Sequence, residues 1–197
     1  MSNAPAIISK LIETFARNIE VYKNQYNETQ LRREFLDPFF EALGWDVTNK
    51  NGWAPAYKEV IHEDAIKIGS ATKAPDYCFR IGGTRKFFLE AKKPSIDIKS
   101  DPHPAYQLRR YAWSAKLPLS ILSDFEEFAV YDCLTRPKQT DKPATARIIY
   151  LITPIISTTG TKSQTSSPET PSSKAPSTSS PPSQKEEKVP PPLTTNS

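Results

Sequence analysis

The first third of the chain repeats apolar residues at helical spacing. Across residues 4–26 they recur every three or four positions with charges between them, which predicts an amphipathic helix. Asn27 then offers an N-cap with Gln30 three residues later, and the periodicity continues to Gly44, a natural helix end. Pro38 predicts a kink or a restart within this second helix.

The middle of the chain changes to short apolar runs separated by turn residues. We expect short strands at 45–47 and 57–61, a loop at 49–56, and a polar loop that ends at Lys73. The stretch 74–94 is the clearest, because two apolar runs meet at a Gly-Gly pair, a pattern typical of a β-hairpin.

The later part of the domain returns to a helix and then to strands. Residues 94–104 have no periodicity and predict an irregular connection, whereas 105–116 has helical spacing. Strands are expected at 117–122 and 127–133 with Asp124 in the turn between them, and 147–152 is either a last strand or an apolar stub. A strand, helix, strand crossover implies an α/β fold with a mixed sheet flanked by helices on both faces.

Composition divides the chain in two. Residues 157–197 are almost entirely Ser, Thr, Pro, Lys and Glu, so we predict a disordered tail after a single domain of residues 1–156. The tail's four lysines and three glutamates account for one of the chain's four net positive charges, which leaves +3 for the domain. A balance this mildly basic permits nucleic-acid binding without requiring it.

The cysteines and the apolar runs bear on the compartment. Cys78 and Cys133 lie in predicted strands, and two lone cysteines without a secretory leader are most simply reduced core residues. No apolar run approaches the roughly 18 residues of a membrane span, so we expect a cytoplasmic protein with no membrane partner. With two histidines and two cysteines, none closely spaced, a structural zinc site is not expected.

The hairpin carries the candidate chemistry. Asp76 stands near the start of its first run, and Glu90 and Lys92 stand near the end of the second, on one strand face about 7 Å apart. Two carboxylates from neighbouring strands suit Mg²⁺, which takes hard oxygen ligands, and the carbonyl of Ala91 would add a third oxygen. Such an ion activates water for phosphodiester hydrolysis, while Lys92 would orient that water or stabilise the transition-state charge.

The same residues also have a plainer interpretation. A Glu-Ala-Lys tripeptide is common and taken alone indicates exposed strand charges. Its spacing from Pro75-Asp76, across the Gly-Gly turn and inside hydrophobic strands, is what makes a catalytic site a comparable interpretation. Both stay open at this stage.

Several further residues would support such a site. Glu34 in the second helix would hold a second metal ion or a water, or be a solvated helix charge. Gln107 and Tyr111 share one face of the later helix and would reach the site or a DNA strand, although helix capping or plain surface chemistry explains their spacing equally well. Arg109 and Arg110 would contact phosphates or be solvated surface charges.

Four other side chains in these regions have simpler expectations. Trp113, beside the two arginines, would stack on bases or pack in the core. Lys93, on the opposite strand face from Lys92, is expected at the surface or on a phosphate. His62 and His103 are expected to be exposed in loops, without a role.

These motifs together resemble the PD-(D/E)XK nuclease superfamily. Pro75-Asp76, Glu90-Ala91-Lys92 and the Gln107 to Tyr111 motif fall in the order of that superfamily. The text around them, over about Glu28 to Tyr150, looks like the N-terminal nuclease domain of type IIG restriction enzymes and is similar to type I restriction R-subunit N-termini. The resemblance implies a restriction-endonuclease-like fold that cuts double-stranded DNA with Mg²⁺, or with Mn²⁺ as a substitute.

The resemblance also assigns roles. It implies that Asp76 and Glu90 are metal ligands, Lys92 the catalytic lysine, Glu34 the helix carboxylate, and Gln107 and Tyr111 the supporting motif. Members of the type IIG group continue through a methyltransferase and a target-recognition domain, which this sequence lacks, so sequence specificity is expected to lie elsewhere. The sequence leaves open whether a homodimer cuts the two strands.

Two alternatives from other classes remain at this stage. The first is a non-catalytic remnant that binds DNA or a partner protein without cutting. The second is an interaction protein that works through the Pro-rich run at 190–192.

Overall fold

The N-terminal helical stretch is broken at one residue. The computed structural model describes residues 4–153, and it begins with α1 (Ala4–Arg17) and α2 (Ile19–Gln25) rather than with one continuous helix. Asn18 separates them: its side-chain amide donates to the carbonyl of Thr14 at 3.0 Å. At this residue the backbone N–H of Asn18 bonds the carbonyl of Phe15, three residues earlier, at 3.1 Å, and this tighter turn interrupts the α-helical pattern.

The second helical stretch consists of three pieces. α3 (Glu28–Leu31) begins with the predicted cap, in which Asn27 and Gln30 exchange hydrogen bonds in a capping box. A π-helical turn, η1 (Arg32–Leu36), follows, and α4 (Asp37–Ala42) starts with Pro38 in its first turn. The predicted restart at Pro38 is therefore confirmed, because proline lacks the N–H that an uninterrupted helix needs.

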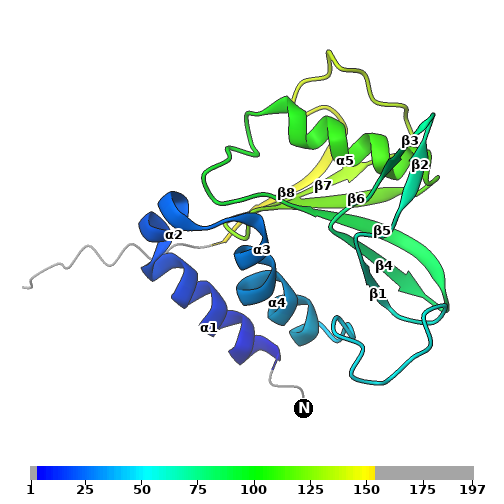
Figure 1. Ribbon diagram of the computed structural model, residues 1–197. Coiled ribbons are helices and arrows are strands. Elements are labelled where there is room, and N and C mark those ends of the chain that lie inside the picture. The colour runs from blue at the N-terminus through cyan, green and yellow to red at the C-terminus, as the bar shows by residue number, and fades with distance from the viewer. Residues whose placement is uncertain (1–3, 154–197) are drawn as a thin grey trace, which may run out of the picture. The chain divides into compact units, whose positions relative to one another are not determined.

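The predicted mixed α/β sheet is confirmed. Its six strands have the order β1-β4-β5-β6-β7-β8, and their bounds are β1 Val60–His62, β4 Tyr77–Ile81, β5 Thr84–Ala91, β6 Leu119–Ser123, β7 Glu127–Asp132 and β8 Arg147–Ile152. Neighbouring strands are antiparallel except β5 and β6, which are parallel and joined through α5 (Pro102–Ser114). Figure 1 shows α5 on one side of the sheet and α1 to α4 on the other.

The alternation of side chains along the hairpin divides the core into two clusters. Cys78 and Phe88 pack with the buried residues of α5, whereas Tyr77 and Leu89 pack with α1 to α4. Phe15 of α1 is 1% exposed at the centre of the second cluster. Helices therefore cover both faces of the sheet, as predicted, and they flank the end of the hairpin that carries the charged residues.

The structure corrects the sequence prediction in several loops. Residues 45–47 are not a strand, because the Asp46 carboxylate accepts the backbone N–H groups of Lys50 and Asn51 and folds the chain into turns. The expected loop before Lys73 contains a short hairpin of β2 (Ile66–Ile68) and β3 (Ala71–Lys73). Its signal was the alternation Ile66-Lys67-Ile68, of which only the isoleucines are buried.

Two boundaries and two side-chain environments complete the comparison. α5 starts three residues earlier than predicted, because Asp101 caps it by accepting the N–H of His103, and β1 starts at Val60 rather than at residue 57. Both cysteines are buried free thiols, as expected.

The helices described within 4–153 include none that is long and apolar enough to span a membrane. The segment 157–197 lies outside the described residues, so the domain boundary stays a prediction.

Candidate active site

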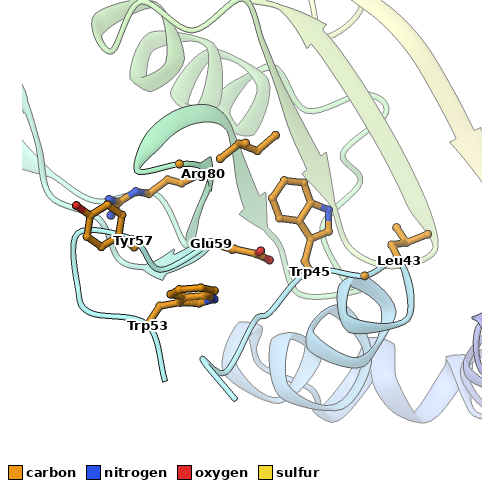
Figure 2. Close-up of a pocket in the computed structure, with 9 residues that line it drawn as sticks. Leu43, Trp45, Trp53, Tyr57, Glu59 and Arg80 are labelled. Carbon is orange, nitrogen blue, oxygen red and sulfur yellow. The ribbon is translucent and has the colours of Figure 1, made fainter. Parts of the chain in front are cut away.

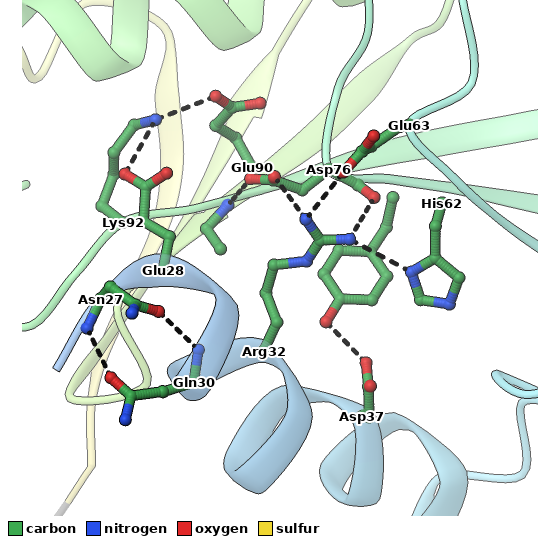
Figure 3. A network of polar contacts seen from close by, with 12 residues as sticks. Asn27, Glu28, Gln30, Arg32, Asp37, His62, Glu63, Asp76, Glu90 and Lys92 are labelled. Carbon is green, nitrogen blue, oxygen red and sulfur yellow. Dashed lines mark hydrogen bonds and ion pairs between the residues drawn. The ribbon is translucent and has the colours of Figure 1, made fainter.

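Asp76, Glu90 and Lys92 come together at one end of the β4–β5 hairpin. Asp76 directly precedes β4, Glu90 is the second-last residue of β5, and Lys92 directly follows β5. Because Tyr77 pairs with Leu89 in this hairpin, Asp76 comes opposite Glu90. The sequence prediction that one hairpin gathers these three groups is therefore confirmed in its geometry (Figure 3).

Asp76 is held by two donors. Its Oδ2 accepts the backbone N–H of Ala91 at 2.7 Å, which ties β4 to the end of β5. Its Oδ1 accepts from the guanidinium of Arg32 at 3.0 Å. The carboxylate is thus fixed in position, with a positive charge beside it.

Glu90 is the buried acid of the site. Only 4% of the residue is exposed, and its Oε1 accepts from Lys92 Nζ at 2.9 Å and from the Gln107 amide at 2.5 Å. Burial, followed by the nearby charge of Asp76, raises the pKa of Glu90 to about 7. Its second oxygen, Oε2, is buried and has no hydrogen-bond partner among the described residues.

Lys92 carries the positive charge between two acids. Its Nζ lies 2.9 Å from Glu90 Oε1 and 3.6 Å from Glu28 Oε1. Burial alone would lower the pKa of Lys92, but the carboxylates of Glu90 and Glu28 outweigh it, and the pKa is raised. The ammonium therefore keeps its proton at neutral pH.

Arg32 completes the site, and sequence reasoning missed it. At the first position of η1, its guanidinium contacts both the carboxylate and the backbone carbonyl of Asp76, at 3.0 and 3.3 Å, and lies 4.9 Å from the centre of the Tyr77 ring. His62, expected to be exposed and without a role, is exposed, but it is in β1 and its Nδ1 lies 3.3 Å from the guanidinium. No local pattern signals contacts between residues 44 positions apart.

The helix carboxylate near the site is Glu28, not Glu34. Glu34 is exposed and accepts the hydroxyl hydrogen of Tyr26, whereas Glu28, at the start of α3, approaches Lys92. Glu28 and Arg32 are four residues apart and share a helix face, and the π-helical turn begins at Arg32.

The residues of α5 divide into two groups. Gln107 bonds Glu90, and Tyr111 is 8% exposed, its pKa raised first by burial and then by the charge of Glu90. Arg109 is 2% exposed and pairs with Asp141 at 2.7 Å, so the surface phosphate contact expected for it is wrong for this structure. Arg110 and Lys93 are exposed, and their predicted DNA contacts stay predictions.

Comparison with known proteins identifies the kind of chain that carries this site. The family model described as the N terminus of the type I restriction enzyme R protein matches residues 25–139, more than half of the chain. The chain belongs to this family.

A curated relative gives a second comparison. The type II restriction enzyme and methyltransferase RM.Eco57I of Escherichia coli is 48% identical over 153 residues, which cover 76% of this chain and 15% of the relative. This chain therefore spans a small part of that relative's length. No solved structure matches it.

The acidic groups of this member of the R protein N-terminus family fit a hard divalent cation. The buried, unpartnered Oε2 of Glu90 beside the Asp76 carboxylate offers the oxygen ligands that Mg²⁺ prefers. Within residues 4–153 there is no group of three or more His, Cys, Asp or Glu side chains placed to hold a metal ion. A cation bound here would thus rely on two carboxylates, the predicted carbonyl of Ala91, water and substrate.

A cavity of this R protein N-terminus domain lies at the other end of the hairpin. It has a volume of about 530 Å³, and Gly82 in the hairpin turn is among its lining residues. Figure 2 shows Trp45, Trp53 and Tyr57 around it, with Glu59 between them. Because Asp76 and Glu90 stand at the opposite end of β4 and β5, this cavity is separate from the candidate active site.

Proposed function

We propose that this chain is a PD-(D/E)XK nuclease domain that hydrolyses phosphodiester bonds of double-stranded DNA with Mg²⁺, in a restriction-modification system. One observation carries the proposal: the buried Oε2 of Glu90 has no partner among the described residues, although it lies beside Asp76 and Lys92. A buried carboxylate oxygen costs free energy unless something meets it. Membership of a restriction-enzyme family makes a cation and a DNA phosphate the natural partners.

Asp76, Glu90 and the carbonyl of Ala91 would hold the cation. A bound Mg²⁺ supplies charge neutralisation at the phosphate and lowers the pKa of an attacking water, and Mn²⁺ has similar ligand preferences. The hydrogen bond from Ala91 N–H to Asp76 fixes one carboxylate, and the bond from Gln107 fixes the other. These two bonds fix the positions of both carboxylates before the substrate binds.

Lys92 would act as a charge rather than as a base. Its pKa is raised by Glu90 and Glu28, so its ammonium is protonated at neutral pH and is not free to accept a proton from water. Placed beside the scissile phosphate, it stabilises the negative charge that develops in the transition state. As part of a restriction-modification system the chain would work in the cytoplasm, and a homodimer would account for cleavage of both strands.

Plasmid cleavage tests this proposal. We expect Mg²⁺-dependent nicking or linearisation by the full chain and a loss of at least about a hundredfold in Asp76→Asn and Lys92→Ala, because the first weakens the hold on the cation and the second removes a positive charge beside the phosphate. Lys86→Ala is the matched control, since Lys86 is an exposed lysine near the other end of the same strand. Equal cleavage by all four proteins, or none by the wild type in either Mg²⁺ or Mn²⁺, would contradict the proposal.

The alternative is a non-catalytic domain that binds DNA or a protein without cutting. The observation in its favour is the ion pair of Arg32 with Asp76, which occupies a carboxylate that catalysis would need. A thermal-shift titration separates the two functions. A nuclease is stabilised by Mg²⁺ or Mn²⁺ in the wild type but not in Asp76→Asn, whereas a non-catalytic domain is stabilised in neither.

A further inference from the structure

The ion pair between Arg32 and Asp76 occupies an oxygen of the proposed metal site. Arg32 Nη1 lies 3.0 Å from Asp76 Oδ1, while Oδ2 already accepts the N–H of Ala91. The two side chains are only 14% and 17% exposed, so water weakens their attraction little. A divalent cation at Oδ1 would compete with the guanidinium, because the two positive charges repel each other.

The remaining contacts of Arg32 are weaker and lie at the rim of the site. Its Nη2 is 3.3 Å from both the Asp76 carbonyl and His62, and Nη1 is 3.6 Å from Glu63, whose side chain is 72% exposed. The side chain starts from the first residue of a π-helical turn, a helix defect that often marks functional sites. The guanidinium therefore has one strong partner, Asp76, and its side chain is partly exposed to solvent.

We propose that Arg32 is a phosphate-binding residue that Asp76 holds until a divalent cation takes the carboxylate, and that the released guanidinium then pairs with a phosphate of the DNA. This inference rests on the proposed nuclease function. The fork of N–H donors in a guanidinium matches a phosphate as well as a carboxylate, so Arg32 exchanges one anion for another. Cation and DNA then support each other's binding, because the cation pairs with the carboxylate that Arg32 leaves and the DNA phosphate pairs with the released guanidinium.

Neighbouring Arg33 provides a matched comparison. It carries the same charge one residue further along η1 and is exposed. Replacing either arginine by methionine removes one positive charge and keeps most of the aliphatic stem, which in Arg32 extends toward the Tyr77 ring. A difference between the two variants therefore reports the contact with Asp76 rather than net charge.

Calorimetry of the full chain tests the inference, with Ca²⁺ as the cation and a short DNA duplex as the anion. Without DNA, we expect Arg32→Met to bind Ca²⁺ roughly tenfold more tightly than the wild type, because the cation no longer displaces a charge-assisted hydrogen bond. In the wild type, DNA should tighten Ca²⁺ binding, and this coupling should shrink severalfold in Arg32→Met. Arg33→Met should behave as the wild type does.

The outcomes separate this inference from the proposed function. Equal Ca²⁺ affinity and equal coupling in the wild type and Arg32→Met would overturn the role of Arg32 while leaving the nuclease intact. No Ca²⁺ binding by the wild type, or binding that Asp76→Asn leaves unchanged, would overturn the metal site itself and the role of Arg32 with it. If circular dichroism shows that Arg32→Met is unfolded, Arg32→Gln takes its place in the same comparison.

Discussion

Asp124 is a carboxyl group buried in the turn between β6 and β7, and the proposed chemistry does not use it. It is 2% exposed, and its Oδ1 accepts the N–H of Glu127 at 2.7 Å. Burial raises the pKa of Asp124 to about 8, and the charges of Glu127 and Glu126 add to the effect. Lys23 and Tyr150 also face it, and together these groups do not compensate for the lost hydration.

The first prediction concerns the pH dependence that Asp124 imposes on stability. The pKa of Asp124 is about 8 in the folded state and ordinarily 3.8, so between these values the folded state keeps a proton that the unfolded state has lost. The contribution of Asp124 to the free energy of unfolding is therefore fully present below pH 3.8 and is lost as the pH rises to 8. The loss is about 1.4 kcal/mol for each pH unit in that interval. Asp124→Asn keeps an acceptor for Glu127 N–H without a charge, so it should match the wild type near pH 4 and be several kcal/mol more stable at pH 9.

Urea unfolding across this pH range makes the measurement. Glu13→Gln, which changes an exposed acid of α1, serves as the control and should track the wild type at every pH. A free-energy difference between Asp124→Asn and the wild type that stays constant from pH 4 to pH 9 would contradict the assignment.

At the scale of the residue, sequence reasoning succeeded where the contacts are local. A Gly-Gly turn starts the hairpin, and a bulge between Phe79 and Arg80 then shifts the pairing by one residue, which brings Asp76 opposite Glu90. Gln107 was found through its helical spacing to Tyr111. Arg32 and Glu28 were missed because their partners lie in a different element, and neither spacing nor composition encodes which helix end faces a given strand end.

At the scale of the element, the four-residue helix α3 positions two side chains of the candidate site. Glu28 is its first residue and Arg32 its C-cap, so this single turn aims two side chains at the site. A helix this short is not stable by itself. Its capping box, with bonds of 2.9 and 3.2 Å between Asn27 and Gln30, satisfies two backbone N–H groups that would otherwise lack partners.

The second prediction follows from that cap. Asn27→Ala should lower the free energy of unfolding by about 1 kcal/mol, the usual cost of losing an N-cap side chain. Asn24→Ala in α2 is the control, because Asn24 is an exposed residue in the last turn of its helix, and its side chain bonds the carbonyl of Glu20 rather than a backbone N–H at a helix start. Its effect should stay within about 0.5 kcal/mol. Equal losses in the two variants would indicate that the box does not stabilise α3.

The elements that were predicted wrongly have a common physical cause. Residues 66–73 form two three-residue strands, too short for alternation to be distinguished from a polar loop. Residues 45–47 have the composition of a strand but are turned by the carboxylate of Asp46. In both places a few hydrogen bonds decide the conformation, whereas the long hairpin at 77–91 is decided by apolar burial on two faces and was predicted correctly.

At the scale of the whole molecule, the order of elements was sufficient for the architecture. Two antiparallel hairpins joined by a helix require a parallel pair in the middle of one sheet, and β5 and β6 are that pair. The helical residues that reach the candidate site come from both layers, Glu28 and Arg32 from one and Gln107 from the other. Among the described residues, the side chains that bond or ion-pair with Asp76, Glu90 or Lys92 thus lie between residues 28 and 107.

The third prediction is that residues 157–197 are dispensable for the proposed chemistry. The segment adds one net positive charge to the +3 of residues 1–156, so its removal should change DNA affinity by no more than about threefold at physiological salt. Cleavage of plasmid DNA by a chain ending at residue 156 should equal that of the full chain, with Lys92→Ala in the shortened chain as the inactive control. Cleavage or DNA binding that disappears with the segment, while the melting temperature is unchanged, would instead favour an interaction protein that works through its Pro-rich run.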